Sequence, residues 1–209
     1  GTTITDDEQD QILELLKEND TILFSDEMYK FLEYNEKDRL NSLTERYDKS
    51  ITLFGMSKSF ALAGLRIGWL VTTRKEWIDQ FVQFKDYTTI CNSASSEILA
   101  LMGLRSKETI LKRNLEIIQM NLRELENFFS EFEEYFEWYS PKAGPIAFPR
   151  LKLNQDVSDF CKELVEQKGV MLLPAGVYDF PVNHFRIGFA RKNLPEALEQ
   201  FHEFLKMKG

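Results

Sequence analysis

The sequence predicts a mixed α/β fold in which two regions are joined by one long helix. Two short apolar runs, residues 51–54 and 65–71, are typical of buried strands in the first region. From residue 106 to about 135, apolar side chains recur at helical spacing, enough for a helix of roughly 40 Å at 1.5 Å per residue. Short strand and helix patterns follow Pro141. We therefore expect three parts, with bounds 1–105, 106–136 and 137–209, the last a small α+β domain.

Composition excludes several classes of function. The net charge of −8 on 209 residues argues against nucleic-acid binding, and no apolar run reaches the roughly 20 residues that span a bilayer. Cys91 and Cys161 lack metal-site spacing and are expected to be reduced core residues of a cytoplasmic protein. His184 and His202 form no ligand cluster either. We expect no metal, no nucleic acid and no membrane among the partners.

The first region begins with a helix and a strand. Thr5 and Glu8 have capping-box spacing, and the helix that they start should end near Asn19. Its expected apolar face comprises Ile12, Leu15 and Leu16. Residues 21–24 predict a strand, and the acidic segment 25–29 follows at its carboxyl end, where ligands bind in open α/β sheets.

The rest of the first region alternates loops and helices. Residues 33–50 are polar and predict a loop with one helical turn near Leu43, whereas residues 75–85 predict a helix. A turn of small residues is expected over 88–96. A further buried helix is indicated by four apolar residues: Ile98, Leu99, Leu101 and Met102.

The small region after Pro141 predicts strands over 146–153, 170–173 and 184–190. Two amphipathic helices are expected between and after these strands, one capped by Asp156 and one by Asn193 with Glu196.

The stretch from Gly55 to Trp69 holds a lysine and an arginine among small and apolar residues. A lysine desolvated in such a segment loses its proton more readily and becomes a nucleophile for carbonyl groups. Arg66 is suited to hold a phosphate. Together Lys58 and Arg66 suggest a phosphorylated cofactor with an aldehyde. The alternative is a surface loop with two solvated cations.

Other charged and polar side chains fit the same chemistry. A pyridoxal phosphate enzyme needs a carboxylate to keep the pyridine nitrogen protonated, a phenol near the ring oxygen, a nucleophilic lysine and arginines for phosphate and substrate carboxylate. Residues of these types stand in order along the chain: Asp26, Tyr29, Lys58, Arg66 and Arg186.

Three segments resemble the class I and II aminotransferases, which are fold type I pyridoxal phosphate enzymes. Ser-Asp-Glu-Met-Tyr at 25–29 is similar to their acidic segment, and residues 57–69 are similar to their lysine signature, with arginine eight positions after lysine. His-Phe-Arg-Ile-Gly-Phe-Ala at 184–190 is similar to their carboxylate-binding strand. The resemblance covers essentially the whole chain. It implies the remnant of a large pyridoxal phosphate domain followed by the small α+β domain.

The resemblance also implies roles in binding pyridoxal 5′-phosphate. Asp26 would pair with the pyridine nitrogen, and Tyr29 would bond the ring's phenolic oxygen. Lys58 would bond covalently to the cofactor's aldehyde and move protons, while Ser57 and Arg66 would hold the phosphate. The alternatives for the same residues are structural: Asp26 caps a turn, Tyr29 packs in the fold, and Ser57 or Ser59 only completes the lysine turn.

Arg186 would bind the α-carboxylate of an amino acid, unless it is an ordinary ion-pair partner. The implied reaction moves an amino group between an amino acid and a 2-oxo acid, in a homodimer. Two alternatives stay open. One is a decarboxylase, lyase or synthase of the same fold, and the other is a non-catalytic fragment that acts as a binding or dimerisation module.

The chain departs from the family in two respects. Gly55 stands where the family often has a phosphate-binding serine, three residues before the lysine. Family members also run to roughly twice this length, with Gly1 corresponding to the last glycine of an Asn-Pro-Thr-Gly turn. We therefore expect the C-terminal part of a larger enzyme, completed by a missing N-terminal segment. A parallel sheet of three strands would otherwise leave apolar faces and edges uncovered.

Overall fold

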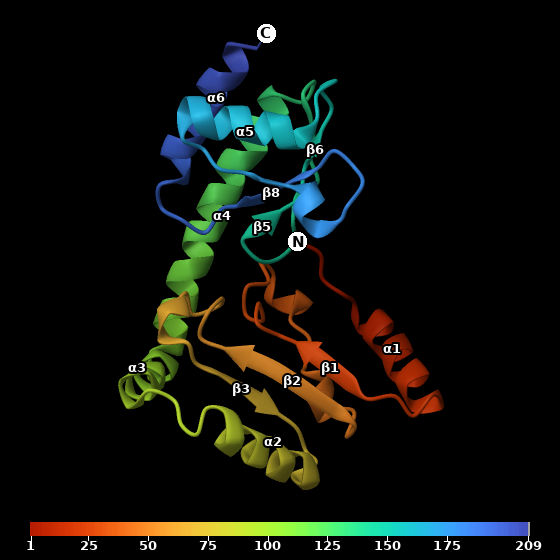
Figure 1. Cartoon of the computed structure of the whole chain (residues 1–209). Coiled ribbons are helices and arrows are strands. Elements are labelled where there is room, and N and C mark those ends of the chain that lie inside the picture. The colour runs from red at the N-terminus through yellow and green to blue at the C-terminus, as the bar shows by residue number, and fades with distance from the viewer. Residues whose placement is uncertain (209) are drawn as a thin grey trace. The chain divides into compact units, whose positions relative to one another are not determined.

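The computed structural model describes residues 1–208, in which the chain forms two compact units (Figure 1). The N-terminal unit comprises Thr3–Asn114, and the C-terminal unit comprises Gly1–Thr2 with Leu115–Gly209. The N-terminal unit contains α1 (Asp6–Glu18), β1 (Leu23–Asp26), β2 (Ser50–Gly55), β3 (Gly68–Val71), α2 (Lys75–Thr88), α3 (Ala94–Arg105) and the short 3-10 helices η1 (Glu36–Asp38), η2 (Leu43–Glu45) and η3 (Ala63–Leu65). Helix α4 (Lys107–Glu131) begins in this unit and continues into the other.

The C-terminal unit contains short strands and two further helices. Its elements are β4 (Phe136–Glu137), β5 (Ile146–Ala147), β6 (Arg150–Leu151), α5 (Val157–Lys168), β7 (Leu173–Pro174), η4 (Ala175–Tyr178), β8 (Phe185–Gly188) and α6 (Leu194–Lys206). No helix within residues 1–208 has both the length and the apolar character that crossing a membrane requires.

The sheet of the N-terminal unit has the strand order β1-β2-β3. Strands β1 and β2 are parallel, whereas β2 and β3 are antiparallel, with Phe54 opposite Trp69. The expectation of an all-parallel sheet was therefore wrong. The strand expected over 65–71 begins only at Gly68, because Arg66 has a left-handed backbone with φ of 55° that ends η3 and turns the chain. The strand expected over 21–24 lies two residues later.

Helix α1 begins with the predicted capping box, since the Thr5 side chain accepts from the Glu8 N–H and the Glu8 carboxylate accepts from the Thr5 N–H. Its buried face was predicted only in part, since Leu16 does pack against the buried cluster around Leu13. Leu13 packs against Leu43 and Tyr47, and Leu15 is 60% exposed. The loop after β1 includes the helical turn expected near Leu43.

Helices α2 and α3 exist as predicted, but the predicted burial of α3 was wrong. Its four large apolar residues, Ile98, Leu99, Leu101 and Met102, are all exposed. The buried positions are Ala100 and Gly103, which lie against the core of Phe54, Met56 and Phe60. A Cβ on Gly103 would lie 2.7 Å from Met56 Cε, so only a small residue lets α3 approach this closely.

Helix α2 lies alongside β3 (Figure 1), and a groove of about 510 Å³ separates them. Its lining is largely apolar and includes Leu70, Ile78 and Val82, each of which is exposed. Cys91, in the turn after α2, is exposed too, so its expected core position was wrong, whereas Cys161 is buried as predicted. Helix α3 begins at Ala94, inside the turn expected over 88–96.

Antiparallel strands in the order β5-β8-β7 form the larger sheet of the C-terminal unit, and β4 pairs with β6. The single strand expected over 146–153 is two strands in different sheets, because Pro149 between them has no N–H for a continuous ladder. The strand expected over 170–173 overlaps β7 only at Leu173, and the strand expected over 184–190 is the shorter β8.

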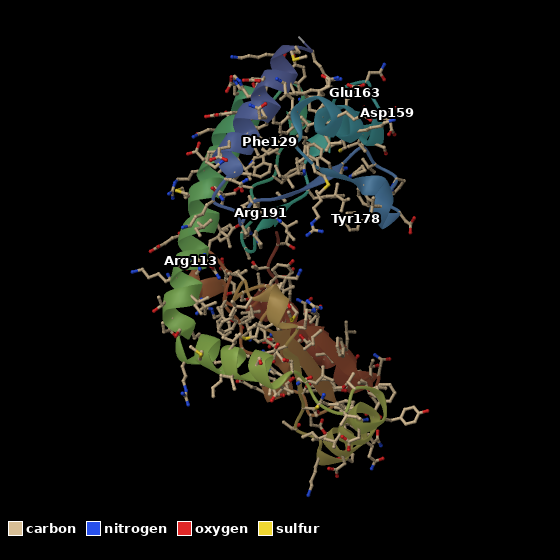
Figure 2. The ribbon with its side chains drawn as sticks, turned by 60° about the vertical axis from the view of Figure 1, so that its left-hand side comes forward. Arg113, Phe129, Asp159, Glu163, Tyr178 and Arg191 are labelled. Carbon is tan, nitrogen blue, oxygen red and sulfur yellow. The ribbon has the colours of Figure 1, made fainter. Side chains whose placement is uncertain are left out.

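Phenylalanine dominates the core of the C-terminal unit. Phe129, labelled in Figure 2, is buried with eight others: Phe128, Phe132, Phe136, Phe160, Phe185, Phe189, Phe201 and Phe204. The predicted cap of α5 is present, since Asp156 accepts from the Ser158 N–H at 2.7 Å. The cap expected for α6 is absent, because the Asn193 side chain makes no cap hydrogen bond.

Candidate functional site

Lys58 lies in the turn that follows β2. Its neighbours Met56, Ser59 and Phe60 are buried, and this leaves the Lys58 side chain on the outer side of the turn, exposed to solvent. The expectation that Lys58 is desolvated by its own segment was therefore wrong for the described residues. Lys58 forms no ion pair within residues 1–208, so its Nζ is free to meet an anion when protonated or a carbonyl compound when neutral.

The structure brings Lys58 to Tyr29. The Lys58 Nζ lies 5.6 Å from the centre of the Tyr29 ring, a distance at which a cation is attracted by an aromatic face. Ser59 holds the two segments together, because its Oγ lies 3.0 Å from the Met28 carbonyl oxygen and 2.5 Å from that of Lys30. Ser59 is fully buried and completes the turn, whereas Ser57 is partly exposed beside Lys58.

Asp26 is the last residue of β1 and lies at the edge of the sheet where β2 also ends. Its register partner is Leu53, two residues before the end of β2. One carboxylate oxygen accepts from the Met28 N–H at 3.0 Å, which is the turn-capping contact considered as an alternative. The carboxylate is exposed and makes no ion pair within residues 1–208, so it is also open to a ligand.

Arg66 lies at the same edge, because β3 runs antiparallel to β2 and begins where β2 ends. Its guanidinium donates to the Ala63 carbonyl oxygen at 2.9 Å. No carboxylate pairs with Arg66 among the described residues. In a chain of net charge −8, two cations without acidic partners, Lys58 and Arg66, lie at one end of one sheet.

The close approach of β2 and β3 explains the glycine at position 55. A Cβ on Gly55 would lie 2.9 Å from both the Gly68 Cα and the Ile67 carbonyl oxygen. These are backbone atoms, which cannot give way as a flexible side chain can. A serine at this position would therefore require the two strands to separate.

Arg186 belongs to the C-terminal unit, on β8. Its guanidinium donates to the Tyr178 hydroxyl at 3.0 Å and has no carboxylate partner among residues 1–208. Within residues 1–208, Arg186 therefore does not form the ion pair that was considered as an alternative. Tyr178 was not among the predicted site residues, because its one sequence feature is an aromatic ring two positions after Gly176. Burial lowers the pKa of the neighbouring His184.

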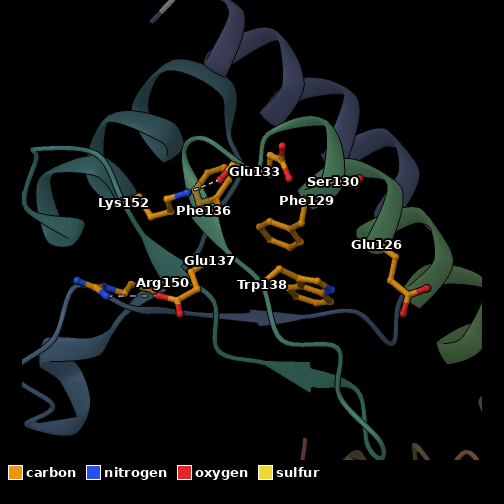
Figure 3. Close-up of a pocket in the computed structure, with 9 residues that line it drawn as sticks. All are labelled: Glu126, Phe129, Ser130, Glu133, Phe136, Glu137, Trp138, Arg150 and Lys152. Carbon is orange, nitrogen blue, oxygen red and sulfur yellow. Dashed lines mark hydrogen bonds and ion pairs between the residues drawn. The ribbon is translucent and has the colours of Figure 1, made fainter.

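The C-terminal unit also has a cavity of about 740 Å³ that none of the predicted site residues line (Figure 3). Phe129 and Trp138 stack in it, with ring centres 4.4 Å apart. Two of its cations are bound within the chain, since Arg150 pairs with Glu137 and Lys152 donates to the Glu133 carbonyl oxygen. Hydrogen bonding by Tyr139 and Arg150 holds the pKa of Glu137 below its ordinary value. The indole N–H of Trp138, which lines this cavity, is buried and has no hydrogen-bond partner among the described residues.

Comparisons with known proteins agree with the fold. The family described as aminotransferase class I and II matches residues 1–201. Capreomycidine synthase from Streptomyces vinaceus is 26% identical over 197 residues, which cover 93% of this chain and 50% of that protein. The structure of a PLP-dependent aminotransferase from Streptococcus suis matches with a TM-score of 0.89 and 29% identity, over 98% of this chain and 54% of that chain.

Cystalysin from Treponema denticola, whose structure contains pyridoxal 5′-phosphate, matches with a TM-score of 0.90. At 19% identity, over 100% of this chain and 55% of that chain, this likeness shows the fold alone. The chain thus spans about half the length of the proteins that it matches.

These matches confirm the predicted fold class, the remnant of a large pyridoxal phosphate domain followed by an α+β domain. They also confirm the resemblance from which pyridoxal 5′-phosphate was expected, since that compound is the cofactor of the matched family. With a family match that extends over residues 1–201, the chain belongs to the class I and II aminotransferases.

Proposed function

We propose that the whole protein moves an amino group between an amino acid and a 2-oxo acid, with pyridoxal 5′-phosphate bound at Lys58. The observation that carries this proposal is the grouping at one end of the β1-β2-β3 sheet. Lys58 lies over Tyr29 there, and both Asp26 and Arg66 lie at the same edge without ion-pair partners among residues 1–208.

The donors and acceptors of this edge fit the cofactor. The free carboxylate oxygen of Asp26 would accept from a protonated pyridine nitrogen, and the Tyr29 hydroxyl would donate to the ring oxygen. Arg66, with Ser57, would bind the phosphate by charge-assisted hydrogen bonds. Position 55 would offer no side chain to that phosphate, since the approach of Gly68 leaves no room for one.

Lys58 is the residue that would take part in the chemistry. When bound, the cofactor supplies an aldehyde that bonds an amine and a ring that accepts electrons from the adjacent carbon. Lys58 would then take a proton from the substrate's α-carbon and return one, since its Nζ has no competing carboxylate among the described residues. Arg186 would bind the α-carboxylate of the substrate.

The test uses the whole protein loaded with pyridoxal 5′-phosphate. Given one amino acid and no acceptor, it should release the matching 2-oxo acid, up to about one molecule per site. Lys58→Ala should reduce the rate at least about a hundredfold, because the proton-transfer group is lost. Lys17→Ala, on the exposed surface of α1, is the matched control and should keep the rate. The proposal is wrong if no amino acid in a broad panel yields its 2-oxo acid.

A lyase, decarboxylase or synthase is the second candidate, and the match to capreomycidine synthase favours keeping it. The same experiment separates the two. An aminotransferase leaves the carboxylate and the carbon skeleton intact in the 2-oxo acid, whereas the other reactions release carbon dioxide or ammonia, or close a ring. Mass spectrometry of the products distinguishes these outcomes directly.

We further propose that the whole protein contains an additional N-terminal segment and forms a homodimer. Two observations support this. The chain spans about half the length of its relatives, and apolar side chains of β3, α2 and α3 are exposed in the N-terminal unit. Light scattering of the whole protein would give the mass of a dimer, and a monomer would contradict the proposal.

A further inference from the structure

The C-terminal unit has a sheet face that turns away from its core and bears Arg186. Strand side chains alternate between faces. On β8 and just beyond it, Phe185, Ile187 and Phe189 are buried in the core. Arg186 therefore projects from the opposite face, with Leu173 beside it in the register of β7.

Aromatic side chains gather next to this arginine. We call Phe148, Tyr178, Phe180 and His184 the aromatic wall. Phe148 is the centre of the wall, since its ring lies 6.3 Å from that of Tyr178, 5.5 Å from that of Phe180 and 5.1 Å from that of His184. Phe148, Tyr178 and Phe180 are all exposed, so their ring faces are available to a ligand.

Tyr178, labelled in Figure 2, is part of the aromatic wall and is also hydrogen-bonded to Arg186. Its hydroxyl oxygen accepts from the Arg186 guanidinium, which leaves the phenol's own proton free to donate. A carboxylate that approaches Arg186 can therefore receive hydrogen bonds from the guanidinium and from the phenol. Tyr178 also lowers the number of conformations that Arg186 can adopt, so less freedom is lost when the carboxylate binds.

The charges near the wall favour an apolar group over an acidic one. Arg150 is a second cation beside the wall. Its backbone forms a β-bridge with that of His184, and its guanidinium pairs with Glu137 at 3.4 Å. A second carboxylate on a substrate would have to compete with Glu137 for it. The faces of the phenyl and phenol rings instead match another aromatic or a large aliphatic group.

From this juxtaposition we propose that the C-terminal unit selects amino acids and 2-oxo acids with an aromatic or large apolar side chain. Arg186 and Tyr178 share the substrate's carboxylate, and the aromatic wall takes its side chain. The proposal rests on the proposed aminotransferase function, whose site it describes in more detail.

The test measures binding to the whole protein by calorimetry, with unreactive carboxylates as probes so that no turnover is needed. The probes are 3-phenylpropionate and succinate, which share a carboxylate and differ in the other end. The Kd for 3-phenylpropionate should be at least about tenfold lower than that for succinate. Phe148→Ala should remove most of this preference and leave the Kd for succinate within about twofold, because the wall loses its centre while Arg186 and Tyr178 stay. Phe180→Ala should act in the same direction more weakly.

Tyr178→Phe separates the carboxylate contact from the wall, since it keeps the ring and removes the hydroxyl. It should raise the Kd of both probes by a similar factor, about tenfold, and leave their ratio unchanged. Tyr139→Phe is the matched control, since Tyr139 is an exposed tyrosine of the same unit that bonds Glu137, and it should change neither Kd.

Preferred binding of succinate, or a Phe148→Ala variant that weakens both probes equally, would overturn the proposal. A Tyr178→Phe variant with unchanged Kd values would remove Tyr178 from the carboxylate site. These failures are distinguishable from failure of the proposed function. If amino acids are converted to 2-oxo acids but acidic ones react best, the function stands and the inference about the wall is wrong.

Discussion

The two units differ in how far their large apolar side chains are buried. In the C-terminal unit, nine phenylalanines are buried, and Phe160 packs against Phe136, Phe185, Phe201 and Phe204. In the N-terminal unit, α2 and α3 expose most of their large apolar residues, and Phe84 is 70% exposed. An amphipathic pattern marks which face of a helix is apolar. Whether that face is buried depends on a partner, which one unit supplies from its own residues and the other does not.

The largest expected effect is on the free energy of unfolding, when one phenylalanine in each unit is replaced. Phe160→Ala should lower the free energy of unfolding by about 3–5 kcal/mol, since it opens a cavity among four other rings. Phe84→Ala should change the free energy of unfolding by less than about 0.5 kcal/mol in this chain, because the ring of Phe84 on α2 is mostly exposed to solvent. Urea denaturation followed by circular dichroism measures both. Equal losses would contradict the contrast between the units.

Thiol reactivity tests the same contrast at the cysteines. Burial raises the pKa of the Cys161 thiol to about 12, so its reactive thiolate is scarce at neutral pH, about a thousandfold scarcer than at the ordinary value of 9.0. Cys91 is exposed. Iodoacetamide should therefore alkylate Cys91 at least about a hundredfold faster, as mass spectrometry of the peptides would show. The two rates should converge in denaturant, and similar rates in the folded chain would contradict the assigned burial.

Two asparagines on α4 provide a smaller effect, one in each unit. Asn121 donates to the carbonyl oxygens of Phe189 and Arg191 at 2.8 and 2.7 Å, whereas Asn114 donates to that of Ser59 at 2.9 Å. Asn121→Ala should cost about 2–3 kcal/mol, because two carbonyls lose their donor, and Asn114→Ala about 1–2 kcal/mol. Thermal unfolding should rank the variants in that order. The reverse order would mean that the carbonyls near β8 find other donors.

The smallest expected effect compares two helix starts. Thr5→Ala should lower the free energy of unfolding by about 1 kcal/mol, because it removes the cap of α1. Asn193→Ala at the start of α6 should change it by less than about 0.5 kcal/mol, since that side chain makes no cap bond. Thr5→Ser keeps the acceptor and serves as the control. An effect at Asn193 as large as that at Thr5 would show that the α6 cap forms in solution.

The order of the site residues could be predicted from the sequence, and so could most helices. Thr5 with Glu8, and Asp156 with Ser158, are contacts between near neighbours in the chain, so their geometry follows from the local sequence alone.

Only the tertiary structure decided burial, strand direction and side-chain partners. Ile98 was expected inside and is outside, because Ala100 and Gly103 are small enough for α3 to approach Met56. The sequence did not decide whether Ser59 binds phosphate or completes the turn. The structure shows that it bonds the 28–30 segment, about thirty positions away in the chain. Tyr178 reaches Arg186 from a different element. Such contacts depend on how distant segments pack, and periodicity in one segment carries no information about the other.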